Sequence, residues 1–154
     1  SEKDIVVVNH NLFLTDEAGN LFCIDALLGM NKWNIKKVDS NRSIRLNKKS
    51  ELVLPTAKNK VLTVSPNLGK VTSEIDLPVD TKSTEITDLQ IIDDNTIIGF
   101  SNGWVYRIKS KQKPEKIFRG GPAPIVSLTN INGDCLITDY DGNFTLLKIS
   151  SSKK

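Results

Sequence analysis

The stretch GNLFCIDALLGMNKW, residues 19–33, decides the fold, because a second stretch of the chain has the same pattern. Residues 59–73 read NKVLTVSPNLGKVTS, and the two stretches align without a gap at an offset of 40 residues. Their apolar positions coincide, and Gly29 aligns with Gly69. Asn59 takes the place of Gly19, and asparagine is among the few residues other than glycine that tolerate a left-handed turn. The chain therefore contains an internal repeat.

Two further copies follow, TIIGFSNGWVYRIKS (residues 96–110) and CLITDYDGNFTLLKI (residues 135–149). The turn positions are 40, 44 and 39 residues apart: Gly19, Asn59, Gly103 and Gly142. Each copy holds two apolar runs, a tight turn and a third, alternating run. In the first three copies a fourth run follows: NKWNIKK, KVTSEIDL and PEKIFR. Short β-rich runs joined by Gly or Asn turns predict β-hairpins, and no amphipathic helical stretch of useful length is found.

A repeating unit of about 40 residues with four strands is typical of a β-propeller blade. We therefore predict an all-β fold, with a single β-propeller region over residues 1–154. It is built of four blade-like, four-stranded antiparallel repeats. These repeats cover approximately residues 3–38, 43–78, 85–119 and 123–150.

The fourth repeat has only three runs and then ends in the polar tail SSSKK. Its outer strand is missing, and nothing that precedes Ile5 could supply it. We therefore expect a partial propeller, or half-ring, whose terminal blades expose apolar faces that monomers rarely tolerate. Two copies could close a ring with two-fold symmetry, or the chain could be the C-terminal half of a longer propeller. A compact four-bladed monomer is the alternative.

Composition is that of a soluble globular domain, with 38% hydrophobic and 25% charged residues. The net charge of +3 is too small to indicate nucleic-acid binding. The dense basic groups, KSKQKPEK at residues 109–116 and the terminal Lys153 and Lys154, are interpreted as solvated loop and tail. No apolar run approaches the roughly 20 residues that span a bilayer.

Cys23 and Cys135 both fall in apolar runs, LFCID and DCLITD, which favours two small buried thiols. A disulfide between them stays open, because sequence gives no distance. Neither cysteine has the spacing of a redox or zinc site.

The first copy resembles the quinoprotein-type propeller repeat. It matches the whole pattern of that repeat, at Gly19, Leu21, Ile24, Asp25, Gly29 and Trp33. The second copy departs from it, with Ser65 in place of the Asp and Ser73 in place of the Trp. The resemblance implies that Trp33 packs between neighbouring blades and that Asp25 braces the turn. Trp104 lies elsewhere in its repeat and is either a core residue or an exposed contact.

The same repeat occurs in pyrroloquinoline-quinone (PQQ) dehydrogenases, in BamB-like scaffolds of outer-membrane protein assembly, and in luminal or extracellular sensor domains. The resemblance therefore implies a non-catalytic scaffold for protein–protein interaction, with partners of unknown identity. The specific form is a BamB-like factor, periplasmic or outer-membrane-associated if bacterial. The alternatives are a fragment of a PQQ-dependent dehydrogenase-like propeller and a sensor propeller.

Catalytic, cofactor and metal sites are not predicted. In the dehydrogenases the cofactor lies against a disulfide of adjacent cysteines, which this chain lacks. The acidic stretches IIDDN (Asp93, Asp94) and TDYDG (Asp139, Asp141) are interpreted as hairpin turns, and His10 as a surface-turn residue. The stretch FRGGPAP, residues 118–124, lacks the lysine of a phosphate loop and links the third and fourth repeats.

Overall fold

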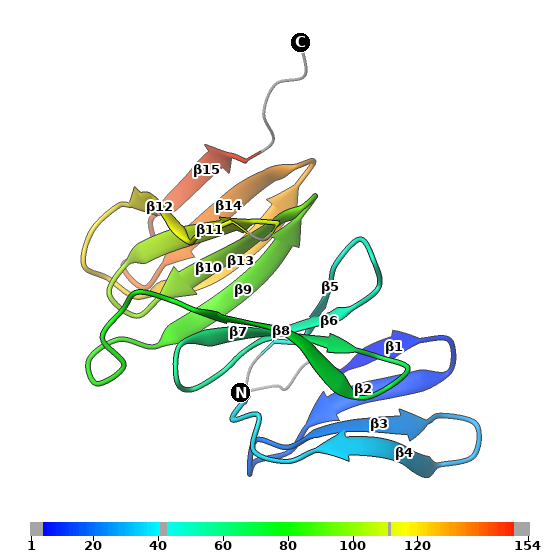
Figure 1. Cartoon of the computed structure of the whole chain (residues 1–154). Coiled ribbons are helices and arrows are strands. Elements are labelled where there is room, and N and C mark those ends of the chain that lie inside the picture. The colour runs from blue at the N-terminus through cyan, green and yellow to red at the C-terminus, as the bar shows by residue number, and fades with distance from the viewer. Residues whose placement is uncertain (1–4, 41–42, 111, 150–154) are drawn as a thin grey trace. The chain divides into compact units, whose positions relative to one another are not determined.

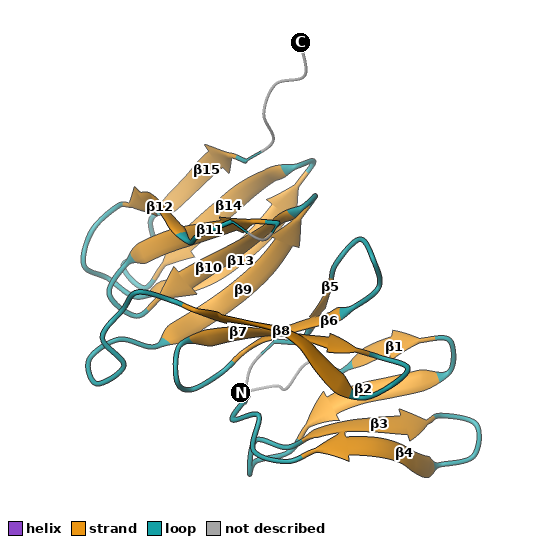
Figure 2. Cartoon of the chain, viewed as in Figure 1, coloured by secondary structure: helices purple, strands orange, loops and turns teal. Residues whose placement is uncertain are grey.

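The computed structural model describes residues 5–40, 43–110 and 112–149 (Figure 1). Within these residues the chain contains strands and loops and no helix, as Figure 2 shows. None of the described residues belongs to a helix long and apolar enough to cross a membrane. Residues 3, 4 and 150 of the predicted repeats lie outside the described residues, as do Lys111 and the tail SSSKK with Lys153 and Lys154.

The chain forms two compact units, unit 1 up to Leu77 and unit 2 from Pro78. Unit 1 contains two four-stranded antiparallel sheets, which we call blade 1 and blade 2. The strands of blade 1 are β1 (Val6–Val8), β2 (Asn11–Thr15), β3 (Leu21–Asp25) and β4 (Met30–Ile35). The strands of blade 2 are β5 (Arg45–Leu46), β6 (Leu52–Pro55), β7 (Lys60–Ser65) and β8 (Lys70–Asp76). In each blade the strands lie in sequence order.

Unit 2 contains blade 3 with four strands and blade 4 with three. The strands of blade 3 are β9 (Ile86–Ile92), β10 (Asn95–Phe100), β11 (Trp104–Lys109) and β12 (Glu115–Arg119). The strands of blade 4 are β13 (Ile125–Ile131), β14 (Asp134–Asp139) and β15 (Phe144–Lys148). No described strand pairs with the outer edge of β15, so the sheet of blade 4 has three strands among the described residues. Each predicted repeat thus holds one sheet, and the predicted all-β class is confirmed.

The repeated turn has the same backbone conformation in all four blades. The residue at the turn position has a positive φ in each case: Gly19 (78°), Asn59 (54°), Gly103 (85°) and Gly142 (83°). Only glycine adopts this region freely, and asparagine is one of the few alternatives. The recurrence of glycine or asparagine at this position of the sequence therefore indicates that the same hairpin turn occurs in each blade.

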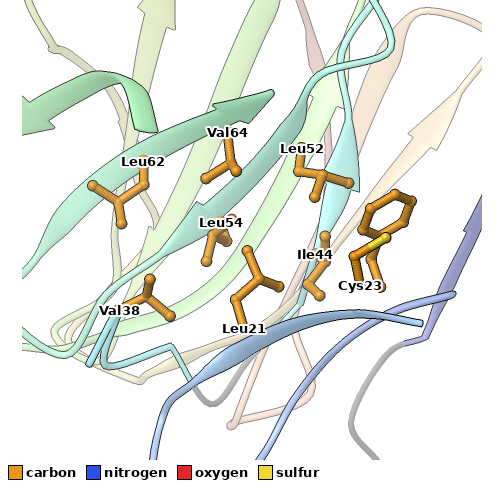
Figure 3. Packing of buried hydrophobic residues seen from close by; sticks show 9 residues of the cluster. Leu21, Cys23, Val38, Ile44, Leu52, Leu54, Leu62 and Val64 are labelled. Carbon is orange, nitrogen blue, oxygen red and sulfur yellow. The ribbon is translucent and has the colours of Figure 1, made fainter. Parts of the chain in front are cut away.

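The core of unit 1 lies between blade 1 and blade 2. Blade 1 contributes the buried side chains of Phe13, Leu21 and Cys23. Blade 2 and its preceding loop contribute Val38, Ile44, Leu52, Leu54, Leu62 and Val64 (Figure 3). These residues alternate along their strands with side chains on the opposite face, as the two-residue period of a strand requires.

The core of unit 2 lies in the same way between blade 3 and blade 4. Blade 3 contributes Ile92, Ile97 and Val105. Blade 4 contributes Ile125, Leu128, Cys135, Ile137 and Ile149. Leu128 N also donates a hydrogen bond to the Asp88 carboxylate (2.8 Å), which ties β13 to β9.

Candidate functional site

Trp33 joins blade 1 to blade 2, as the sequence resemblance implies. Its indole Nε1 donates a hydrogen bond to Pro66 O in the β7–β8 turn (2.9 Å). Its ring lies 5.9 Å from the ring of Phe13 in blade 1. A Cβ placed on Gly69 would lie only 2.5 Å from Trp33 Cδ2, so the ring packs directly on the turn of the neighbouring blade. Trp33 is therefore a packing residue between blades.

Asp25 holds the β3–β4 turn that precedes Trp33. Its Oδ1 accepts hydrogen bonds from the backbone N–H groups of Leu27 (2.9 Å) and Leu28 (3.0 Å), and its carbonyl accepts one from Gly29 N (2.8 Å). The bonds from Leu28 and then Leu27 lower the pKa of the Asp25 carboxyl, because they stabilise its charged form. The predicted brace of the turn is present.

The other polar candidates lie in turns. His10 is exposed in the β1–β2 turn at φ 63°. Asp93 and Asp94 form the β9–β10 turn. Asp139 accepts hydrogen bonds from both the side-chain Nδ2 (2.9 Å) and the backbone N (3.0 Å) of Asn143. The side-chain bond and then the backbone bond lower the pKa of Asp139, which is the behaviour of a hairpin-turn carboxylate.

No group of three His, Cys, Asp or Glu side chains within the described ranges is arranged to hold a metal ion. The stretch FRGGPAP connects β12 to β13, as predicted, and its Gly121 carbonyl approaches the turn at Gly103 so closely that a Cβ there would collide with it. Asp141 is an exposed residue of the β14–β15 turn.

The two cysteines are buried free thiols, Cys23 in unit 1 and Cys135 in unit 2. Burial raises the pKa of the Cys23 thiol and raises that of Cys135 to about 11. A thiol with a raised pKa carries little thiolate at neutral pH and reacts slowly. These side chains act as small core residues, as the sequence favours.

Trp104 opens β11 and is half-buried. Lys116 Nζ lies 4.6 Å from the centre of its ring and Arg119 Cζ lies 5.3 Å from it. Both cations come from β12, the outer strand of the same blade. The face of this tryptophan is therefore covered by cation–π contacts within blade 3.

A shallow hollow of about 300 Å³ lies in unit 1 beside the β4–β5 link. It is lined by four lysines, two acids and apolar side chains: Lys36, Lys37, Lys58, Lys60, Asp39, Glu74, Ile35, Val38, Leu62 and Val71, with Thr56. Lys60 Nζ forms ion pairs with Glu74 (2.5 Å) and Asp76 (3.5 Å), and the Glu74 hydrogen bond is the first cause of its raised pKa. The lining of the hollow carries more lysines than acids, but Glu74 and Asp76 partly compensate the positive charge of Lys60.

Four large aliphatic side chains stand exposed on two turns of unit 1, and we call them the apolar rim. They are Leu27 (74% exposed), Leu28 (70%) and Met30 (62%) at the β3–β4 turn, and Leu68 (67%) at the β7–β8 turn. Leu28 and Leu68 occupy equivalent positions of the repeat. Figure 1 shows these turns at corresponding ends of blades 1 and 2. Grouped exposed aliphatic side chains of this size mark contact surfaces more often than isolated ones do.

No family model matches the sequence, and no curated protein matches it. Solved structures do match in fold. BamB from Moraxella catarrhalis is 18% identical, with a TM-score of 0.75 over 94% of this chain and 42% of that chain. BBS1N, solved in complex with ARL6DN, is 15% identical, with a TM-score of 0.72 over 98% and 48%. The extracellular domain of the putative one component system BT4673 from B. thetaiotaomicron is 13% identical, with a TM-score of 0.72 over 97% and 21%.

These likenesses show the fold, which is that of a partial β-propeller. The chain spans less than half of the length of each of these three structures. The quinoprotein-type repeat family itself stays a prediction from the motif of residues 19–33.

The apolar rim was not singled out from the sequence. Leu28 and Leu68 were recognised only as matching positions of the repeat, where an apolar residue is ordinarily read as core. The signal that distinguishes them is their place: both directly precede a turn glycine, Gly29 and Gly69, where a strand has already ended. An apolar side chain at the tip of a tight hairpin turn has no sheet face to pack on.

Proposed function

We propose that this chain is a non-catalytic β-propeller scaffold that binds other proteins through the apolar rim. The observation that carries the proposal is the exposure of Leu27, Leu28, Met30 and Leu68 on two neighbouring turns. Leaving such side chains in water costs free energy that contact with a partner recovers.

The rim is held in place by hydrogen bonds before any partner arrives. The Asp25 carboxylate fixes the backbone of Leu27 and Leu28, and Ser65 O accepts a hydrogen bond from Gly69 N (2.9 Å). Trp33, in β4, links blade 1 to the β7–β8 turn through its bond to Pro66 O. Preorganised contact groups lose little conformational entropy on binding, which favours affinity from a small surface.

The finer proposal is a BamB-like factor in the assembly of outer-membrane β-barrel proteins, located in the periplasm or at the outer membrane. It is supported by the BamB fold likeness and by the repeat motif of residues 19–33. BBS1N, which has the same fold, was solved in complex with ARL6DN, and this supports the coarser scaffold proposal. A sensor role is the second candidate, because the extracellular domain of BT4673 has the same fold over 97% of this chain.

Site-specific photo-crosslinking in the source cells tests the scaffold proposal. A photoreactive residue is placed at position 28, at position 68, or at Tyr140, a control position that is 79% exposed in unit 2. We expect one discrete protein adduct shared by positions 28 and 68 and none at the control. Adding Leu28→Ser to the position-68 probe should abolish that adduct. Equal labelling at all three positions, or no adduct at either rim position, would refute binding through the rim.

Complementation tests the finer proposal. The chain is exported to the periplasm of a bacterium that lacks BamB, and the amounts of its outer-membrane β-barrel proteins are measured. A BamB-like factor should restore those amounts, and Leu28→Ser with Leu68→Ser should reduce the restoration whereas Tyr140→Ser should not. If the crosslinking succeeds and the complementation fails, the scaffold proposal stands and the BamB-like one falls.

A further inference from the structure

Each blade has two faces, and unit 1 shows how they pair. We call the face of blade 1 that carries Phe13, Leu21 and Cys23 its back face. It packs on what we call the front face of blade 2, formed by Leu52, Leu54, Leu62 and Val64. All seven side chains are buried. Register confirms the assignment, since β6 pairs with β7 through Leu52 opposite Val64 and Leu54 opposite Leu62.

Unit 2 follows the same rule. The alignment of Gly142 with Gly19 places Cys135, Ile137 and Leu147 at the front-face positions of blade 4. Cys135 and Ile137 belong to the core that blade 4 shares with Ile97 and Val105, at the back-face positions of blade 3, and the partly buried Leu147 packs against that core. A back face therefore meets the front face of the next blade in both units.

Blade 4 has a back face of its own, and it is open. In the alignment of Gly142 with Gly19, the back-face residues of blade 1 correspond to Leu136, Phe144 and Leu146 of blade 4. In blade 1 the three are fully buried, whereas in blade 4 Phe144 is 72% exposed, Leu146 is 56% exposed and Leu136 is partly exposed. The residues have kept their apolar character without a described segment to cover them.

Blade 1 has the complementary surface, a front face. At the offset of 40 residues, the front-face residues of blade 2 correspond to Leu12, Leu14, Phe22 and Ile24 of blade 1. These four are only partly buried, whereas their equivalents in blade 2 are buried. Val7 pairs with Leu12 across β1 and β2 and adds a side chain that is 61% exposed.

We propose that the back face of blade 4 in one copy packs on the front face of blade 1 in a second copy of this chain. The packing of blade 1 on blade 2 shows that an apolar back face is covered by the apolar front face of another blade. A second copy of this chain offers such a front face on its blade 1. The contact joins two different surfaces, so two copies satisfy both only by making it twice, in a closed dimer.

Sedimentation equilibrium of the 154-residue chain at micromolar concentration tests the proposal, and a dimer is expected. Phe144→Asp and Val7→Asp each place a charge in every contact, and each should weaken association roughly 100-fold or more. Both side chains are exposed in the single chain, so circular dichroism should report an unchanged fold. Leu68→Asp, at 67% exposure on the rim, is the matched control and should remain a dimer.

A mixture of Phe144→Asp and Val7→Asp separates this contact from unspecific association. Each variant alone has no intact contact, whereas a mixed pair joins the unaltered Phe144 of one copy to the unaltered Val7 of the other. The mixture should therefore regain association that neither variant shows alone. A wild-type monomer at every concentration would overturn the proposal and leave these faces to further blades or to another protein. Dimers that persist in both variants, or a mixture that stays monomeric, would also overturn it.

Discussion

Gly69→Ala tests whether the blades of unit 1 are joined as described. Gly69 has a φ of 62°, and its position for a Cβ is occupied by the Trp33 ring, with Cδ2 at 2.5 Å, Cγ at 2.7 Å and Cε3 at 2.9 Å. These atoms lie near the base of the ring and cannot swing away as the end of a flexible chain can. An alanine at this position must displace the indole from the turn of blade 2.

The expected cost is the sum of three physical effects. An alanine at positive φ costs about 1 kcal/mol relative to glycine. Displacing the indole removes its hydrogen bond to Pro66 O, a loss of about 1 kcal/mol. It also disturbs the ring contact with Phe13, a further loss of about 1 kcal/mol. We therefore expect Gly69→Ala to lower the free energy of unfolding by about 3 kcal/mol.

Gly29→Ala is the matched control, because Gly29 is the equivalent residue of blade 1. Its φ is 66°, but no atom lies within 4 Å of its Cβ position. Only the backbone strain remains, so the expected cost is about 1 kcal/mol. Urea titration followed by circular dichroism measures both variants, and a Trp33→Ala background supplies the double-mutant cycle.

In the Trp33→Ala background the cost of Gly69→Ala should fall to about that of Gly29→Ala, because the obstacle is gone. The coupling free energy between positions 33 and 69 is then about 2 kcal/mol. If Gly69→Ala and Gly29→Ala cost the same in the wild-type background, Trp33 does not pack on this turn. The account of how blade 1 docks on blade 2 would then be wrong.

Two further predictions concern pH and cofactors. Turn hydrogen bonds lower the pKa values of Asp25, Asp80 and Asp139, the first cause being Leu28 N for Asp25, Lys82 N for Asp80 and the Asn143 side chain for Asp139. The stabilisation from these carboxylates is complete above their unfolded-state pKa of about 4, and it is lost as the pH falls through their lower folded-state pKa values. The melting temperature should therefore decrease when the pH is lowered below about 4, and this decrease should be smaller in Asp25→Asn. A melting temperature that is flat from pH 5 to pH 2.5 would contradict this. Because we propose a scaffold without a redox cofactor, pyrroloquinoline quinone with Ca²⁺ should leave the melting temperature unchanged, and a saturable rise would support the dehydrogenase-like alternative.

The elements of this fold could be predicted from the sequence because hairpin signals are local. Alternating apolar residues specify a strand within a few positions, and Gly19 or Asn59 specifies a left-handed turn by its own conformational preference. These turns recur every 39 to 44 residues, so the blades could be identified without any knowledge of distances in space. The three described strands of the last repeat were predicted in the same way, from its three runs.

The sequence by itself thus determined the strands, the turns and the propeller class, but it could not separate apolar side chains that are covered from those that are not. Phe144 and Leu21 occupy the same repeat position, yet Leu21 is fully buried under blade 2 whereas Phe144 is 72% exposed. Leu68 fits the repeat as well as any core residue, yet it stands on a turn tip in solvent. Burial depends on neighbours that are distant along the chain, and the packing of Trp33 on Gly69 is one such contact. Only the tertiary structure places those neighbours, and therefore only it could reveal the rim and the open faces.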